Sequence, residues 1–203
     1  MAKILDFKTK YAPKIFAIDP GFSTEEGCGW AIINCDAQKY GGNKNSPLVL
    51  RSGNIKPFAN ISSLQNMIEL AHKLERIWEE DSGFSRQPKT VVVEKPNIDL
   101  NTPLNQESIR DLAIFVGVLI KIFVPELILA PTVKEWSDAL SKEETQKYIF
   151  NCSDKISLKN INRDMSCIAL HNRHNVYDAI GLGIYGGNVT NNQLPFPETF
   201  LRI

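Results

Sequence analysis

The sequence predicts an α/β fold with a mixed five-stranded sheet and helices on both faces of that sheet. Three short apolar runs, Lys14–Asp19, Gly29–Ile33 and Leu48–Ile55, follow one another with no helical pattern between them, which is typical of an antiparallel meander. Beyond them, helical periodicity alternates with two further apolar runs, as expected for parallel strands joined by helices. The run Thr90–Glu94 begins with four β-branched residues, which indicates a strand buried on both faces.

Length and composition favour a single soluble domain. The chain has 203 residues, of which 43% are hydrophobic and 23% charged, and a chain of this size buries roughly 70% of its unfolded surface. We expect one domain over residues 1–203, with a core at about 14–186 and a C-terminal tail at about 188–203. No apolar run reaches ~18 residues and Met1–Tyr11 has no signal-peptide pattern, so we expect a cytoplasmic protein without a membrane span.

The predicted meander contains two loops. The first strand, Lys14–Asp19, enters a loop rich in glycine and acids at Phe22–Gly27 before its hairpin partner begins. The polar segment Asp36–Pro47 contains adjacent glycines and separates the second strand from the third.

Helices and parallel strands are predicted over the rest of the chain. Ser62 and Ser63 offer N-caps for a helix that runs to about Glu80, with apolar residues at i, i+3 and i+4 spacing. The other predicted elements are a strand at Thr90–Glu94, a helix at Gln106–Phe123, a strand at Leu127–Ala130, a helix at Lys142–Phe150 and a last helix at Asp178–Tyr185.

Three acids stand at the ends of these elements. Asp19 and Glu94 each end an apolar strand, and Asp178 opens the last helix. Carboxylates at the carboxyl ends of strands lie where ligands bind in α/β folds, so the three could meet and hold a pair of divalent cations for phosphodiester cleavage. Each also has a structural reading: Asp19 as a turn residue, Glu94 as a paired buried acid and Asp178 as a helix N-cap.

Cysteine spacing and charge limit the alternatives. The four cysteines show no C-x-x-C spacing, which argues against zinc and favours reduced thiols. Net charge is zero, whereas most dedicated DNA-binding proteins are basic. A nucleic-acid function therefore requires a local basic face.

Four segments resemble, in order and spacing, the RuvC-type Holliday junction resolvases, including phage-encoded members, of the ribonuclease H-like superfamily. Together they span roughly residues 14–186. The segments are Ile18-Asp19-Pro20-Gly21 followed by Gly29-Trp30-Ala31-Ile32, then Val92-Val93-Glu94-Lys95-Pro96, then Ala130-Pro131-Thr132-Val133-Lys134-Glu135-Trp136, and finally His174-Asn175-Val176-Tyr177-Asp178-Ala179-Ile180-Gly181-Leu182-Gly183.

The resemblance implies a ribonuclease H-like fold and a metal-dependent endonuclease that resolves four-way junctions, flaps or forks in DNA. It implies Asp19, Glu94 and Asp178 as ligands of two Mg²⁺ or Mn²⁺ ions, and we expect Asp19 to bridge the two. Cleavage by direct water attack would leave 5′-phosphate and 3′-hydroxyl ends. The family acts as homodimers in the cytoplasm of bacteria or phage-infected cells, and a twofold dimer suits a fourfold junction.

The chain departs from the family at the fourth ligand. Asn175 occupies the position three residues before Asp178, where the family has Asp or His, and an uncharged carbonyl oxygen binds cations more weakly. His174 is a candidate to bind a metal, position the water or protonate the leaving group, or simply a surface hydrogen-bonding residue. The loop after Asp19 also carries the extra acids Glu25 and Glu26.

Candidate DNA contacts flank the acids. Lys95 and Arg173 lie beside presumed ligands, Lys134 follows the fifth strand, and Phe22 could either stack on a base or pack in the core. Three further cations are weaker candidates, and the favoured reading of the two lysines among them is a solvated mixed-charge helix face. They are Arg110, Lys142 and Lys147.

Two other functions compete with the nuclease. Actin-like ATPases also begin with Asp-x-Gly after a strand, but they need about twice this length. A catalytically weakened RuvC-like module that grips branched DNA or a protein partner without cutting remains the alternative. The apolar helical segment Leu112–Phe123 is either a core helix or a dimer interface.

Overall fold

The structure is a computed structural model. It describes residues 14–21, 27–35, 47–59, 62–82, 88–95, 106–138, 140–191 and 200–202. Phe22, Glu25 and Glu26 lie outside the described residues.

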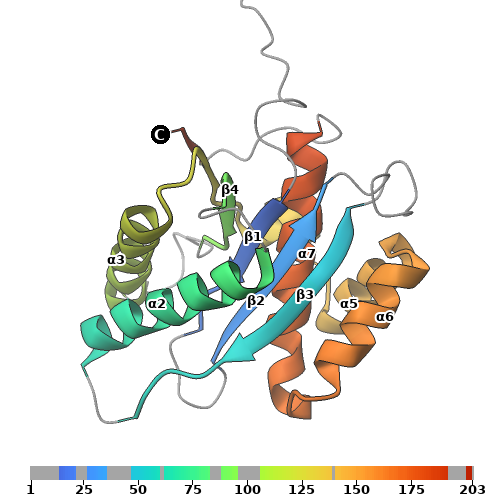
Figure 1. Cartoon of the computed structure of the whole chain (residues 1–203), viewed down its shortest axis with the longest axis horizontal. Coiled ribbons are helices and arrows are strands. Elements are labelled where there is room, and N and C mark those ends of the chain that lie inside the picture. Colours follow the sequence, from blue (N-terminus) through green and yellow to red (C-terminus); the bar gives the residue numbers. More distant parts are fainter. Residues whose placement is uncertain are drawn as a thin grey trace, which may run out of the picture.

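A six-stranded sheet in the order β3-β2-β1-β4-β5-β6 forms the centre of the molecule (Figure 1). The first three strands make the predicted antiparallel meander, and β4 and β5 extend it in parallel from β1. All five predicted strands are present. The strands are β1 (Lys14–Asp19), β2 (Cys28–Asn34), β3 (Leu48–Ile55), β4 (Thr90–Val93), β5 (Leu127–Leu129) and β6 (Phe200–Arg202).

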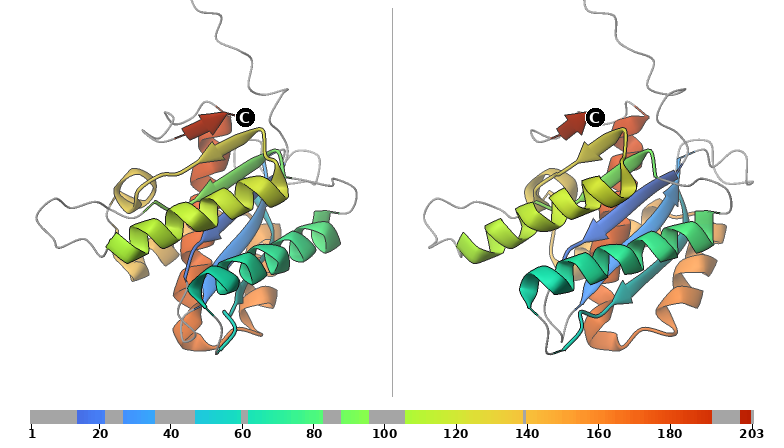
Figure 2. Two further views of the ribbon diagram at one scale, coloured as in Figure 1. Left: turned by 90° about the vertical axis from the view of Figure 1, so that its left-hand side faces the viewer. Right: turned by 60° about the vertical axis from the view of Figure 1, so that its left-hand side comes forward.

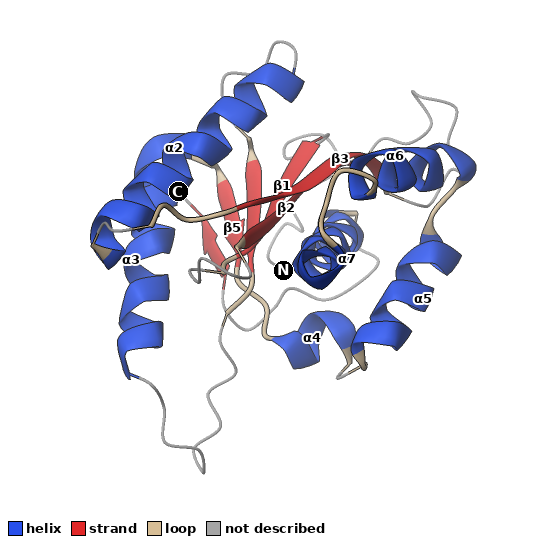
Figure 3. Ribbon diagram, turned by 90° about the horizontal axis from the view of Figure 1, so that it is seen from below, coloured by secondary structure: helices blue, strands red, loops and turns tan. Residues whose placement is uncertain are grey.

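Helices cover both faces of the sheet, which confirms the predicted fold class. Two long helices, α2 (Ser63–Ser82) and α3 (Gln106–Phe123), lie on one face, as the side views of Figure 2 show. Helix α7 crosses the other face, flanked by the shorter helices (Figure 3). The elements on that face are α4 (Val133–Ser137), α5 (Lys142–Cys152), α6 (Lys155–Met165), the 3₁₀ turn η2 (Leu170–Asn172) and α7 (Arg173–Thr190).

The central strands are apolar without interruption because both faces are buried. In β1, Phe16 and Ile18 pack in the core beneath α2 and α3, whereas Ile15 and Ala17 pack in the core beneath α7. This two-sided burial explains why the sequence shows continuous apolar runs in place of alternation. None of the described helices is long and apolar enough to cross a membrane.

Helix α7 lies close against the sheet because its contact positions are glycines. A Cβ atom on Gly183 would stand 2.3 Å from Cγ1 of Ile33, and one on Gly186 would stand 2.5 Å from Cγ2 of Val92. The helix is also longer than predicted: it begins at Arg173 and ends at Thr190. The prediction that Asp178 opens this helix was therefore wrong, since Asp178 lies within it and is not its N-cap.

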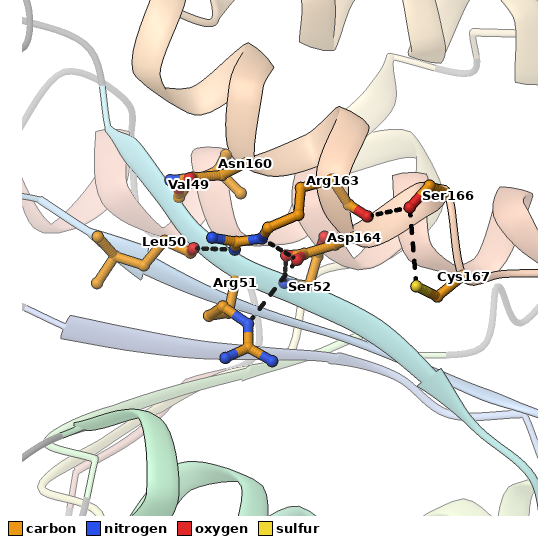
Figure 4. A network of polar contacts seen from close by, with 9 residues as sticks. All are labelled: Val49, Leu50, Arg51, Ser52, Asn160, Arg163, Asp164, Ser166 and Cys167. Carbon is orange, nitrogen blue, oxygen red and sulfur yellow. Dashed lines mark hydrogen bonds and ion pairs between the residues drawn. The ribbon is translucent and has the colours of Figure 1, made fainter.

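Helix α6, which was not predicted, occupies the outer edge of β3. Its polar side chains hydrogen-bond to backbone groups of this edge strand, which would otherwise be open to pairing with another chain. Figure 4 shows this network. The bonds run from Asn160 Nδ2 to the Val49 oxygen (2.8 Å), from Arg163 Nη2 to the Leu50 oxygen (3.3 Å) and from the Ser52 nitrogen to Asp164 Oδ2 (2.8 Å).

The segment expected to be a C-terminal tail contributes to the fold. Its first residues complete α7, and residues 200–202 form β6, which pairs antiparallel with β5. A three-residue strand carries too little periodicity to be seen in the sequence.

Candidate active site

Asp19 and Glu94 stand side by side at the carboxyl ends of two adjacent parallel strands. The register of β1 and β4 pairs Ile18 with Val93, so the next residues along each strand are Asp19 and Glu94. The Glu94 backbone nitrogen donates to the Ile18 oxygen at 3.3 Å, which continues the pairing beyond the end of β4. Neighbouring strands are about 4.8 Å apart, so the two acids are adjacent.

Both acids project from the face of the sheet that α7 covers. Side chains alternate along a strand, which places Asp19 on the same side as Ile15 and Ala17, and Glu94 on the same side as Val92. These three apolar residues all belong to the core beneath α7. The two strand-end acids therefore face the helix that carries the third.

The first turn of α7 is fixed over this edge of the sheet through Asn175. Its Nδ2 donates to the Gly27 oxygen at 2.9 Å. A Cβ atom on Gly29, the β2 partner of Asp19, would lie 2.1 Å from the Asn175 oxygen, so helix and strand are in backbone contact here. Asp178 follows three residues later, on the same side of the helix as Asn175.

Trp136, which was not predicted to be a site residue, connects Glu94 to α7. Trp136 Nε1 donates to Glu94 Oε2 at 2.9 Å. The indole also lies on Gly181, where a Cβ atom would stand 2.5 Å from the ring. Since Gly181 is three residues beyond Asp178, the ring joins Glu94 to the stretch of helix that carries the third acid.

The negative charge of Asp178 affects the pKa of Glu94. Burial raises the pKa of Glu94 to about 7; the Trp136 hydrogen bond lowers this pKa, and the negative charge of Asp178 raises it. Burial also raises the pKa of Asp178, against the lowering effect of the positive charges of His174 and Lys142. Half-buried acids that repel each other form a site that a cation would stabilise.

The side-chain oxygens at this site are suitable ligands for a hard divalent cation, although they are not gathered around a single position. Carboxylate and amide oxygens are the ligands of Mg²⁺ and Mn²⁺. Among the residues that the structure describes, no three His, Cys, Asp or Glu side chains stand close enough together to hold a metal ion. Asn175 is only 6% exposed and its amide nitrogen binds Gly27, so its Oδ1 is the one side-chain atom suited to a cation.

A pocket of about 330 Å³ with both cationic and acidic side chains opens at the start of α7. Three of the predicted residues, Arg173, His174 and Asp178, line it. Lys142, for which a solvated helix face was the favoured reading, is exposed and also lines this pocket. The full lining is Lys142, Glu143, Gln146, Leu170, Arg173, His174, Tyr177 and Asp178.

The remaining predicted contacts are spread more widely. The Lys95 backbone nitrogen donates to the Pro131 oxygen at 2.8 Å, next to Glu94, and Lys134 lies on the short helix α4. Lys147 is exposed on α5. Arg110 belongs to α3 on the opposite face, where it pairs with Asp111 at 3.1 Å, so the structure does not bring it to the acids.

Solved structures of junction resolvases share this fold. RuvC from Thermus thermophilus matches with a TM-score of 0.59 over 89% of this chain and 97% of its own, at 12% identity. The T. thermophilus RuvC in complex with a Holliday junction substrate matches with a TM-score of 0.59 over 90% and 98%, also at 12% identity. The yeast mitochondrial Holliday junction resolvase Ydc2 matches with a TM-score of 0.59 over 93% and 84%, at 10% identity.

No protein-family model matches the sequence, and no curated protein matches it either. The structural matches nevertheless cover most of this chain and of each resolvase. The chain therefore has the fold of the RuvC-type resolvases, which confirms the ribonuclease H-like fold that the motifs implied.

The raised pKa of Glu94 predicts that the metal-free protein loses stability as the pH rises. The unfolded chain releases this proton near the ordinary value of 4.5, whereas the folded chain holds it to about 7. Between these values the native state binds more protons than the unfolded state, so the free energy of unfolding falls with increasing pH. Thermal melts in EDTA should show a fall in Tm across this window that is smaller in Glu94→Gln. An equal fall in the variant would contradict the assignment.

Proposed function

We propose that this protein is a divalent-metal-dependent endonuclease that cuts branched DNA. The observation that carries the proposal is that Asp19 and Glu94 end adjacent parallel strands and that Asp178, on the helix above, lies near enough to Glu94 to raise its pKa. The RuvC fold supports it, because a solved RuvC complex contains a Holliday junction.

The three acids would divide the binding of two Mg²⁺ or Mn²⁺ ions. We expect Asp19 to bind both ions, while Glu94 and Asp178 would each bind one. Asn175 Oδ1 and the His174 imidazole are the additional ligand candidates. Such ions make the attacking water more acidic and stabilise the leaving oxygen of a phosphodiester.

The open ligand arrangement is consistent with repulsion among the acids. Carboxylates that share a buried site stay apart unless a positive charge offsets them, and the Asp178 charge already disfavours ionisation of Glu94. Bound cations would offset this repulsion and draw the acidic side chains together.

The pocket lined in part by Asp178 brings cationic side chains close to one of the proposed ligands. Lys142, Arg173 and His174 line it, and cations beside a cleavage site favour the approach of a phosphate. His174 would donate a proton to the leaving oxygen or orient water. Lys95 and Lys134 extend the proposed DNA contact along the strand ends.

A second candidate is a binding module that grips branched DNA or a protein partner without cutting it. The observation that favours it is the lack, among the described residues, of three acids or histidines already gathered around one point. Asn175 in place of a charged ligand points the same way. The endonuclease and the binding module would have the same fold. They would differ in whether the acids at this edge of the sheet bind metal ions and cleave DNA.

We also propose a homodimer, as suits symmetric cleavage of a fourfold junction. The apolar character of α3 does not by itself require one. Phe115, Leu119 and Phe123 are buried in the core with α2, so the core reading accounts for this helix. Light scattering on the purified protein measures its mass directly.

Cleavage of a synthetic four-way junction separates the two candidate functions. We expect cutting in Mg²⁺ or Mn²⁺, none in EDTA, and much less on a linear duplex of the same sequence. Because a wrong junction sequence could conceal activity, the junction should carry a mobile core that samples several sequences. Tight junction binding without cutting in either metal would favour the binding module.

A further inference from the structure

We infer that Trp136 is a positioning residue that holds one oxygen of Glu94, so that Glu94 offers only Oε1 to a divalent cation. The inference rests on the proposed function and concerns the same site. Neither the charge pattern nor the motifs of the sequence give Trp136 this role.

The hydrogen bond from Trp136 to Glu94 has one possible direction. An indole nitrogen is a donor only, and it lies 2.9 Å from Glu94 Oε2. A hydrogen bond to a charged acceptor is among the stronger ones in proteins. The oxygen that accepts from the indole faces Trp136, and we infer that Oε1, the other oxygen, is the atom that would bind the cation.

The two chain segments that carry Glu94 and Trp136 are fixed to each other. The Lys95 nitrogen, one residue after Glu94, donates to the Pro131 oxygen at 2.8 Å. Directly after Pro131, Thr132 and Glu135 form a reciprocal capping box: the Thr132 nitrogen donates to Glu135 Oε2 at 2.7 Å, and the Glu135 nitrogen donates to Thr132 Oγ1 at 3.3 Å. The segment that carries the Trp136 donor is therefore held in place relative to the segment that carries the Glu94 acceptor.

The indole is also held from the side of α7. Trp136 is 9% exposed, and Gly181 leaves room for its ring, since a Cβ atom there would stand 2.5 Å from Cζ3 of the indole. Any side chain at position 181 would push the ring away. The same contact connects the orientation of Glu94 to the helix that bears Asp178.

A fixed carboxylate binds a cation better than one that must be ordered on binding. Groups that hydrogen-bond to metal ligands orient them, and their loss typically lowers metal affinity about 10–100-fold. Without the indole N–H, Glu94 would rotate and could bind through both oxygens. Metal binding would then be weaker, and fewer bound ions would have the geometry for cleavage.

Mn²⁺ titration of the DNA-free protein by calorimetry tests the inference. Trp136→Phe keeps an aromatic ring at the site and removes the N–H donor, and we expect its Mn²⁺ affinity to fall about 10–100-fold. The matched control is Trp78→Phe, since Trp78 is buried in the core beneath α2 on the opposite face. It should lose stability and keep its Mn²⁺ affinity.

Gly181→Ala provides a second variant that leaves the indole intact and displaces it. Its control is Gly117→Ala in α3, where a Cβ atom would meet nothing within 4 Å. We expect Gly181→Ala to weaken Mn²⁺ binding and Gly117→Ala to leave it unchanged. On junction DNA, both Trp136→Phe and Gly181→Ala should lower kcat more than they raise KM.

The outcomes separate this inference from the proposed function. Wild-type protein that binds no Mn²⁺ overturns the metal site and the inference with it. Wild-type protein that binds Mn²⁺, together with a folded Trp136→Phe that binds it equally well, overturns the positioning role alone. Circular dichroism and thermal melts of each variant establish that it is folded.

Discussion

Asp19→Asn should reduce the rate of junction cleavage by about 10³-fold or more, equivalent to at least about 4 kcal/mol of transition-state stabilisation. The substitution keeps the shape of the side chain and removes its charge. Asp19 ends β1 beside Glu94, which follows β4, and we propose that Asp19 binds both ions. Single-turnover cleavage of a labelled four-way junction in Mg²⁺ measures the effect.

Binding and cleavage should separate in this variant. Because the substituted amide carries no negative charge, the affinity for junction DNA should be retained or increased. Asp164→Asn is the matched control: Asp164 is a buried acid that contacts Arg51 at 3.8 Å and Arg163 at 2.8 Å on the α6 side of β3. It should lower stability and leave cleavage intact. Equal cleavage by Asp19→Asn and wild type would remove Asp19 from the mechanism.

Gly29→Ala should lower the free energy of unfolding by about 3 kcal/mol and reduce activity with it. The new Cβ atom would stand 2.1 Å from the Asn175 oxygen, and this is a contact between two backbones that no side-chain rotation relieves. Strand β2 is held on both sides by β1 and β3, so the helix has to move. The start of α7, which carries Asp178, would shift away from Asp19.

Thermal unfolding measures this effect, and a chain of this size should lose about 6–12 °C in Tm. Gly117→Ala serves again as the control, because it fills open space in α3 and should raise stability by up to about 1 kcal/mol. Wild-type stability in Gly29→Ala would show that α7 does not lie against β2 as the structure describes.

The strands and the acids at their ends could be read from the sequence. Apolar runs that are buried on both faces are continuous, and they stop where a charged residue emerges at the sheet edge. Asp19 and Glu94 mark such stops, and the structure places them on neighbouring strands. Local pattern was sufficient here because the charged residue that ends each apolar run also marks the end of the strand.

The first residue of helix α7 could not be predicted from local sequence pattern. Asp is a frequent N-cap, and Asp178 therefore favoured a helix start, whereas the helix begins at Arg173. The polar residues before Asp178 are helical because Asn175 packs on Gly29 and binds Gly27. Those contacts come from strands about 150 positions earlier, which no local pattern contains.

Trp136 and α6 were missed for a related reason. The spacing of Thr132 and Glu135 is a capping-box signature and could have predicted α4. Nothing in the sequence, however, directs the Trp136 indole towards Glu94. Helix α6 does carry a helical signal, since Ile161 and Met165 are buried at i, i+4 spacing after the N-cap Asp154. Its hydrogen bonds to the open edge of β3 are long-range contacts that no local pattern contains.

Anomalous X-ray scattering from crystals soaked in Mn²⁺ tests most directly whether the three acids hold divalent cations. We predict two peaks ~3.5–4 Å apart, with Asp19 bound to both, Asp178 bound to one and Glu94 bound through Oε1 alone. Glu94 Oε2 should remain on the Trp136 indole. No peak at this edge of the sheet in excess Mn²⁺, with the three carboxylates more than ~8 Å apart, would contradict the account.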